Sequence, residues 1–154
     1  MYTFRVQRGK LTAKDYRSLA EFRYQIRQFL RFSENAALNA GLNPRQHQLL
    51  LALKGLPEDV KPTIGELAGR LHLRHHSAVE LIDRLETHGY VRRSRNRDDR
   101  RQVLVTLLPR GEKLLEQVAR DRISELRASG AALVSAISAL LESGGSPAGR
   151  KKPR

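Results

Sequence analysis

Arginine is the residue type whose spacing first suggests chemistry in this chain. Six arginines lie within residues 92–101, RRSRNRDDRR, where two aspartates interrupt them. Guanidinium groups bind phosphate oxygens through forked hydrogen bonds, so such a cluster is typical of contact with a polyanion. Two more basic clusters lie within residues 1–14 and 144–154, and the three clusters carry 12 of the 13 net positive charges. This clustering favours local contacts with nucleic acid over a general need for solubility.

Histidine is the second residue type that could do chemistry. His72, His75 and His76 lie close together, with His47 upstream, but the chain has no cysteine and no carboxylate spaced to complete a metal site. Zinc sites usually combine imidazoles with thiolate or carboxylate ligands at closer spacing. We therefore expect no metal and no cofactor, and a metal-responsive regulator is the weaker alternative. The preferred interpretation is that His75 and His76 face DNA.

Composition limits the other function classes. The 154 residues, 40% hydrophobic and 29% charged, suffice for one packed domain and leave little room for two. No carboxylate pair, nucleophile–base spacing or glycine-rich phosphate loop is visible, so we do not expect an enzyme. The absence of cysteine favours a cytoplasmic protein. No apolar run approaches the ~18 residues of a membrane span, so no membrane partner is expected.

The elements that must position these side chains follow from the hydrophobic period. Apolar residues recur every three or four positions between residues 12 and 41, which predicts one long helix opened by a capping box of Thr12 and Asp15. A second helix is expected over 43–55, with Pro44 at its first position. A third opens at Thr63, residues 72–74 form a tight turn, and a fourth ends at Gly89. The order helix, turn, helix predicts a helix-turn-helix.

Beyond residue 89 the period changes from 3.6 to 2, which indicates two strands joined by the polar loop RNRDDR. Such a hairpin directly after a helix-turn-helix is a wing. Pro109 restarts the helix, and Gly130 is expected to break it into two final helices. The expected fold is mainly α with a small β-hairpin wing: a winged helix-turn-helix at about 43–108, with dimerisation helices at about 12–41 and 109–142. A basic arm at 1–11 and a disordered basic tail at 143–154 flank this single domain.

The helix after the turn is expected to enter the major groove of DNA, where side chains of its first turns reach base edges. Its arginines at either end suit phosphate contacts, and the wing is shaped to lower an arginine into the minor groove. Asp99 is expected to hold Arg101 by a bidentate ion pair. The expected DNA-binding residues are Arg74, His75, His76, Ser77, Val79, Glu80 and Arg84 on the helix, and Arg95, Arg97, Asp99, Arg100 and Arg101 on the wing.

The stretches ELAGRL, VELIDRLETHGYVRR and DDRRQVLVTL followed by Gly111 resemble the multiple-antibiotic-resistance regulator (MarR) family of bacterial winged-helix repressors. The resemblance covers about residues 12–142. It implies a homodimer built from the N-terminal helix and the last two helices, with Asp99 and Arg101 on the family's wing aspartate–arginine pair. The chain differs from the family in its Arg74-His75-His76-Ser77 helix start, in Leu107-Leu108-Pro109 before the glycine, and in short final helices.

The same resemblance implies a small aromatic carboxylate or phenolic effector in a cleft between the dimerisation helices and the winged domain. Tyr16, Phe22, Arg23, Arg27 and His47 are the candidate pocket residues, with an arginine to pair the carboxylate. The competing interpretation of the arginines is a solvated stripe at i, i+4 spacing, and it is the stronger of the two. His47 is more simply explained as a buried histidine packed against the first helix.

These observations predict a homodimeric repressor that binds a pseudo-palindromic site on double-stranded DNA and is released by a small aromatic anion. Its half-sites are expected about one helical turn apart. The alternative is an architectural or accessory DNA-binding protein without an effector. A single symmetric footprint favours the first, and similar binding to many sequences favours the second.

Overall fold

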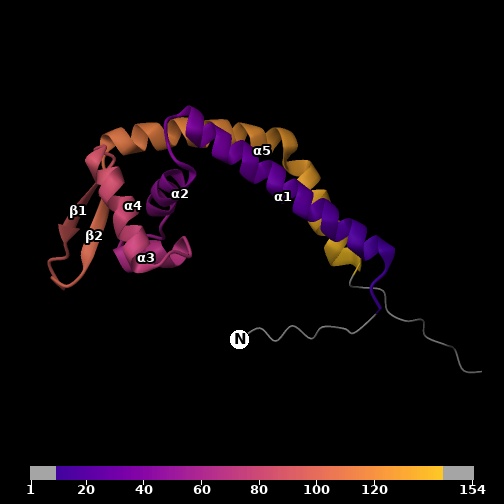
Figure 1. Ribbon diagram of the computed structural model, residues 1–154, viewed down its shortest axis with the longest axis horizontal. Coiled ribbons are helices and arrows are strands. Elements are labelled where there is room, and N and C mark those ends of the chain that lie inside the picture. Colours follow the sequence, from indigo (N-terminus) through magenta and orange to yellow (C-terminus); the bar gives the residue numbers. More distant parts are fainter. Residues whose placement is uncertain (1–9, 144–154) are drawn as a thin grey trace, which may run out of the picture. The chain divides into compact units, whose positions relative to one another are not determined.

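The computed structural model describes residues 10–143, with the side chain of Ser143 excepted. Most of the expected N-terminal arm and the expected C-terminal tail lie outside these residues. Seven elements follow one another along the chain (Figure 1): α1 (Ala13–Asn39), α2 (Pro44–Lys54), α3 (Ile64–Arg70), α4 (His75–Thr87), β1 (Val91–Arg95), β2 (Val103–Leu107) and α5 (Pro109–Ser143). The fold is mainly α with a two-stranded hairpin, as the hydrophobic period predicts.

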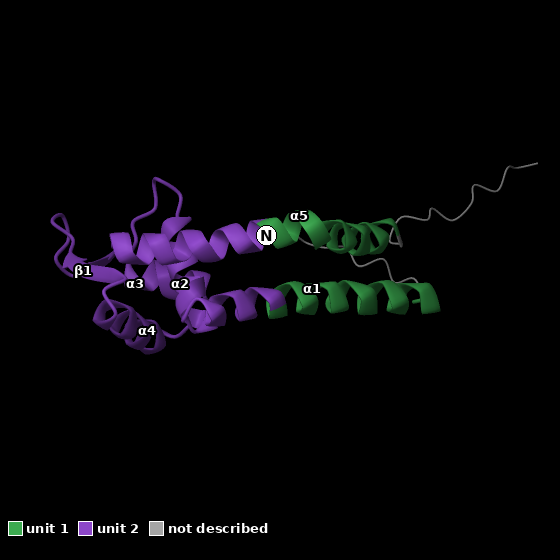
Figure 2. Ribbon diagram, turned by 90° about the horizontal axis from the view of Figure 1, so that it is seen from above, with its two compact units in different colours: residues 1–31, 124–154 green, residues 32–123 purple. Residues whose placement is uncertain are grey.

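The chain divides into two compact units (Figure 2). One unit, here called the winged unit, comprises residues 32–123. The other, here called the two-helix unit, comprises residues 1–31 and 124–154, of which 10–31 and 124–143 are described. Helices α1 and α5 each contribute to both units.

The winged unit is built on one hydrophobic core. Helices α2, α3 and α4 and the hairpin each turn their apolar side chains inward, and the largest fully buried ones include Leu49, Leu50, Leu67, Ile82, Leu85, Val91 and Val105. The segment before α3 also joins the hairpin, because the backbone N–H of Val105 donates to the carbonyl oxygen of Pro62 at 2.9 Å. This bond holds strand β2 against the helix-turn-helix.

Local caps begin α1, α2 and α3 where the sequence predicts these helices to start. At α1 the side chain of Asp15 accepts the backbone N–H of Thr12 at 2.7 Å, and the Thr12 hydroxyl accepts the N–H of Asp15 at 3.3 Å. A complete capping box opens α2 at Asn43. At α3 the Thr63 hydroxyl accepts the N–H of Glu66 at 3.1 Å, while the Glu66 carboxylate pairs with Arg70. These bonds satisfy amide groups that a helix start leaves unpaired.

The hairpin leaves α4 through a left-handed residue. Gly89 has a φ of +72°, a conformation that glycine adopts without steric cost. Strands β1 and β2 are antiparallel, with Val91 opposite Leu107 and Arg93 opposite Val105. Val91 of β1 and Val105 of β2 are buried, whereas the next residue of each strand, Arg92 and Thr106, is exposed. One face of the wing therefore packs on the core.

The expected break at Gly130 is wrong, because α5 is one continuous helix of 35 residues. A glycine within a helix costs about 1 kcal/mol relative to alanine. Its neighbours in the sequence ASGAALVSAISALL are mostly alanine, leucine and serine, and the strong helix formers among them continue the helix through this single weak position.

The two-helix unit exposes many large apolar side chains. Ala136 is its one buried hydrophobic residue among those described, whereas Leu11, Tyr16, Leu19, Tyr24, Leu30, Leu126, Val134, Ile137 and Leu141 are exposed. The stretch Pro109–Glu142 is also long and apolar enough to span a membrane, which the sequence did not lead us to expect. A single such helix is weak evidence of a span, because helices that pack on other protein pass the same test.

Candidate nucleic-acid interface

Helix α4 presents the predicted recognition residues on the face opposite its core contacts. Its buried side chains are Ala78, Leu81, Ile82 and Leu85. His75, His76 and Glu80 are exposed, and Ser77 and Val79 are half-buried at the edge of the exposed face. The helix therefore packs by one stripe and leaves a polar, nearly neutral surface free to meet base edges.

The start of α4 has a strained turn and no side-chain cap. His72 takes a positive φ of 52° in the turn that precedes the helix. Arg74 occupies the N-cap position with extended backbone angles and makes no side-chain hydrogen bond to the first turn. Amide groups without a side-chain cap and the positive end of the helix dipole, with the exposed Arg74 beside them, suit a phosphate contact.

The far end of α4 is capped by His88. The Nδ1 atom of His88 lies 2.6 Å from the carbonyl oxygen of Arg84, and its ring stacks on Tyr90 with centroids 5.6 Å apart. The guanidinium of Arg110 lies 5.4 Å from the centroid of the same Tyr90 ring. The Arg84 side chain is exposed and, within the described chain, makes no ion pair.

The wing turn is held by backbone and amide bonds. Asn96 is only 5% exposed; its Nδ2 donates to Gln102 Oε1 at 2.9 Å, and its Oδ1 accepts the N–H of Asp98 at 3.1 Å. Asp99 Oδ1 accepts the backbone N–H of Arg101 at 3.0 Å. The expected bidentate ion pair between Asp99 and Arg101 is absent from the described residues. The carboxylate instead accepts a backbone N–H and so helps to shape the turn.

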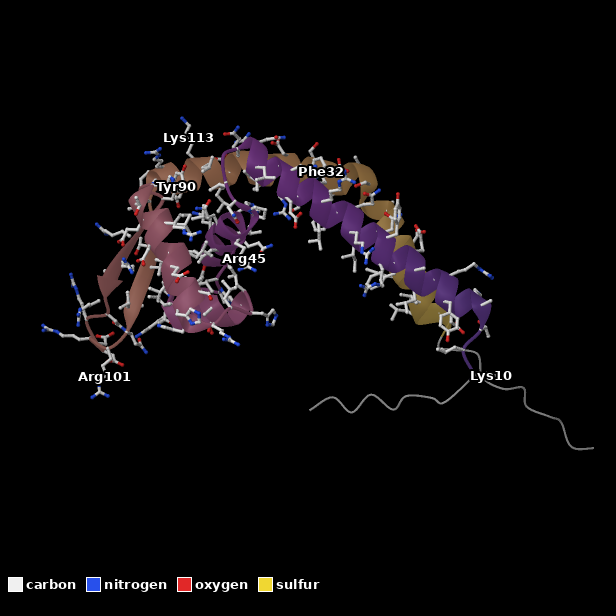
Figure 3. The ribbon with its side chains drawn as sticks, in the orientation of Figure 1. Lys10, Phe32, Arg45, Tyr90, Arg101 and Lys113 are labelled. Carbon is white, nitrogen blue, oxygen red and sulfur yellow. The ribbon has the colours of Figure 1, made fainter. Side chains whose placement is uncertain are left out.

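Four arginines at and beside the turn of the wing are left without an ion pair in the described part of the chain. Arg95, Arg97 and Arg100 line a cavity of about 470 Å³ together with Asn96. Arg101 extends from the tip of the hairpin (Figure 3). All four arginines are exposed, and none makes an ion pair among residues 10–143. Exposed unpaired guanidinium groups on a projecting hairpin are suited to phosphate and minor-groove contacts.

One interaction in this region was not predicted. Arg93 of β1 pairs with two carboxylates of α4: Nη1 lies 2.7 Å from Asp83 Oδ1, and Nη2 lies 2.7 Å from Glu86 Oε2. The sequence signal that could have found this pairing is the i, i+3 spacing of Asp83 and Glu86, which places both on one side of the helix. Arg93 is thus set apart from the other arginines of the basic cluster.

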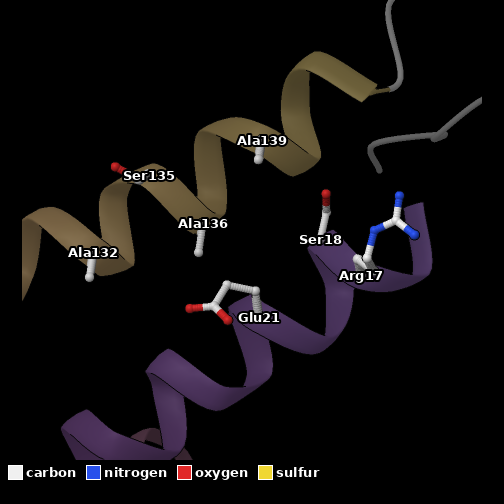
Figure 4. A pocket seen from close by; sticks show the side chains of 7 residues that line it. All are labelled: Arg17, Ser18, Glu21, Ala132, Ser135, Ala136 and Ala139. Atoms are coloured by element: carbon white, nitrogen blue, oxygen red, sulfur yellow. The ribbon is translucent and has the colours of Figure 1, made fainter. Parts of the chain in front are cut away.

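The predicted effector residues fall in different units. Tyr16, Arg23 and Arg27 are exposed on α1 in the two-helix unit, and Phe22 is half-buried there. A cavity of about 470 Å³ in this unit (Figure 4) has a different lining: Arg17, Ser18, Glu21, Ala132, Ser135, Ala136 and Ala139. The five candidate residues therefore do not line one described cavity.

His47 lies in the winged unit and is 2% exposed. Its expected partner was α1, but its polar contact is with α5, where Arg122 Nη1 lies 3.1 Å from His47 Nδ1. Burial, with the charge of Arg122, lowers the pKa of His47 from 6.5 to about 4. The imidazole is therefore neutral at pH 7 and accepts a hydrogen bond from the guanidinium.

Within residues 10–143, no group of three or more histidine, aspartate or glutamate side chains lies close enough to hold a metal ion. His72, His75 and His76 are all exposed at the turn and at the start of α4.

Residues 40–102 match the sequence model of the MarR family. A curated relative, an uncharacterized HTH-type transcriptional regulator of Bacillus subtilis named YsmB, is 40% identical over 65 residues, which cover 42% of this chain and 44% of the relative. This chain spans about half the length of the curated relatives it matches.

Solved structures extend the likeness beyond the matched segment. A MarR family protein from Bacillus stearothermophilus is 26% identical, with a TM-score of 0.65 over 76% of this chain and 80% of that one. Overoxidized AbfR bound to DNA is also 26% identical, with a TM-score of 0.55 over 83% of this chain and 93% of that one.

Proposed function

We propose that this chain is a sequence-specific DNA-binding transcriptional regulator of the MarR family, because residues 40–102 match the sequence model of that family and a MarR family protein of 26% identity has a similar structure. The observation that carries the proposal is the combination, in one unit, of an exposed face on α4 with a wing on which Arg95, Arg97, Arg100 and Arg101 make no ion pair within residues 10–143. A similar structure that was determined bound to DNA supports it further. The curated relatives are named as regulators, and no enzymatic activity is proposed.

The proposed contacts divide into two kinds. His75, His76 and Glu80 meet base edges in the major groove, with Ser77 and Val79 at the edge of the contact. Arg101 enters the minor groove, and the remaining contacts are to phosphates from Arg74, Arg84, Arg95, Arg97 and Arg100. Asp99 contributes by shaping the turn that carries Arg101. In this division the arginines supply affinity and the neutral helix face supplies specificity.

The proposed regulator acts as a homodimer in the cytoplasm. The exposed apolar side chains of the two-helix unit support dimerisation. Among the described residues of this unit only one hydrophobic side chain is buried, and a second copy of the chain would cover the exposed ones. A two-fold symmetric dimer places two copies of α4 on one side of a DNA duplex, so its site is a pseudo-palindrome.

We further propose that the dimer represses transcription and is released from DNA when a small aromatic or phenolic anion binds to it. The exposed arginines of α1 and the aromatic side chains beside them support an anionic aromatic ligand by their chemistry. Binding would change the equilibrium between DNA-competent and incompetent dimers. A panel of aryl carboxylates and phenols should contain compounds that weaken DNA binding; unchanged affinity across the panel would remove the effector from the proposal.

Binding-site selection followed by footprinting tests the central proposal. We expect the wild-type protein to recover one symmetric motif and to protect it as a discrete site. Equal protection of many unrelated sequences would instead identify an architectural DNA-binding protein. Cleavage of plasmid DNA in magnesium would contradict both interpretations. Sedimentation equilibrium in parallel tests the dimer.

A further inference from the structure

Arg93 differs from its neighbours in the basic cluster because its charge is already used within the protein. Its side chain pairs with both Asp83 and Glu86 and is one-third exposed. The other five arginines of residues 92–101 are exposed and make no ion pair in the described part of the chain. A guanidinium committed to two carboxylates has few donors left for a phosphate.

The contact between Arg93 and Glu86 involves backbone as well as side chain. Glu86 Oε1 accepts the backbone N–H of Arg93 at 2.9 Å, and Glu86 Oε2 accepts Nε at 2.9 Å. These hydrogen bonds hold the pKa of Glu86 below its ordinary value, the backbone bond contributing most. The Glu86 carboxylate thus binds the middle of strand β1 from the last turn of α4.

The position of this contact determines what it can control. Arg93 lies opposite Val105 in the hairpin, and Val105 is fully buried. Residues 83 and 86 lie on the C-terminal half of α4, whose N-terminal half presents His75 and His76. The contact therefore joins the proposed base-reading helix to the base of the wing that carries Arg101.

We infer that Arg93, with Asp83 and Glu86, forms a clamp that holds the wing in a defined orientation to the recognition helix, and that Arg93 does not itself contact DNA. This inference rests on the proposed function, since it assigns positioning residues to the same interface. Lysine cannot replace Arg93, because a single ammonium lacks the planar fork that reaches two carboxylates.

Two substitutions test the clamp from its two sides. Arg93→Lys keeps the charge and removes the fork, and Glu86→Gln removes one carboxylate. Removing a negative charge near DNA strengthens binding if only electrostatics matter, whereas loss of the clamp weakens it. We expect both variants to bind the selected duplex more weakly, on the order of tenfold, with an unchanged slope of log affinity against log salt.

The surface pair of Glu116 and Arg120 on α5 supplies matched controls, Glu116→Gln and Arg120→Lys. Both controls should bind DNA like the wild type. Tighter binding by Glu86→Gln would overturn the clamp. A third variant, Arg93→Gln, removes the cation itself. A salt slope lower by about one for Arg93→Gln would overturn the clamp too, because that change identifies a direct phosphate contact.

Hydrogen exchange in the free protein separates the clamp from the proposed function. We expect Arg93→Lys and Glu86→Gln to speed exchange of the wing amides, including that of Asn96, which donates to Gln102 O, while amides of α3 keep wild-type rates. Unchanged wing exchange in both variants would overturn the clamp. A wild-type protein that binds no duplex would defeat the proposed function, and the exchange rates would still decide the clamp.

Discussion

The guanidinium of Arg122 on α5 lies against the buried imidazole of His47 on α2, with Nη1 3.1 Å from Nδ1. The two residues are 75 positions apart in the chain. The guanidinium can only donate hydrogen bonds, so the contact requires an unprotonated ring nitrogen on His47. Protonation of His47 would place two cations in contact within the protein.

This contact predicts a loss of stability in acid. The pKa of His47 is about 4 in the folded protein and near 6.5 when unfolded. Between these values the unfolded chain binds a proton that the folded protein does not. The free energy of unfolding should therefore be highest above pH 6.5 and should decrease as the pH drops towards 4, by up to about 3 kcal/mol.

Urea unfolding at neutral pH and at several values down to pH 4 measures this dependence. His47→Gln should flatten it, whereas His76→Gln, at an exposed position, should keep it. If His47→Gln and the wild type lost stability equally over this window, His47 would not be the titrating group.

Arg101→Ala should weaken binding to the selected duplex on the order of tenfold. It should also lower the slope of log affinity against log salt by about one, because one cation leaves the DNA contact. Fluorescence anisotropy at several salt concentrations gives both quantities. Lys113→Ala on α5 removes an equal charge from an exposed position outside the proposed interface and should leave both unchanged. Wild-type affinity for Arg101→Ala would refute the wing contact.

His75 and His76 should determine base preference. Neither side chain contributes to the buried face of α4, so alanine at either position should leave folding intact and change the sequence motif recovered by selection. We expect the affinity for random DNA to stay near the wild-type value, since the phosphate contacts remain. Identical motifs for the variant and the wild type would contradict the role in recognition.

The turn before α4 should tolerate glycine better than histidine. His72 has a φ of 52°, which costs a residue with a Cβ atom about 1 kcal/mol, so His72→Gly should stabilise the protein by up to that amount. Gly89→Ala is the reverse change, because it adds a Cβ atom at a residue with a φ of 72°. Nothing lies within 4 Å of that atom, so the backbone conformation alone should destabilise the variant. Thermal unfolding should rank the stabilities in the order His72→Gly, wild type, Gly89→Ala.

Gly111 should not accept a side chain. A Cβ atom there would lie 2.4 Å from the carbonyl oxygen of Tyr90, which already accepts the N–H of Leu108 at 2.9 Å. We expect Gly111→Ala to lower the free energy of unfolding by about 2 kcal/mol or more. Gly69→Ala in α3 meets nothing within 4 Å and should be neutral or slightly stabilising. Equal stability of the two variants would contradict the close approach.

The sequence by itself predicts the elements of the winged unit, because their signals are local. The Asn43 cap, the Gly89 turn and the change of period after α4 each depend on residues a few positions apart. The exposed recognition face of α4 follows in the same way, since a 3.6-residue period separates its buried and exposed residues. Local reasoning failed at Gly130, where neighbouring helix formers outweigh one glycine.

Tertiary structure decided which polar groups meet. Arg93 belongs by sequence to the basic cluster, yet packing of β1 against α4 commits it to Asp83 and Glu86. Asp99 binds a backbone amide rather than the Arg101 side chain, and His47 meets Arg122 on α5. Charge and hydrophobic period specify which residues are available. The partner of each depends on distances between elements, which the composition of any one segment does not contain.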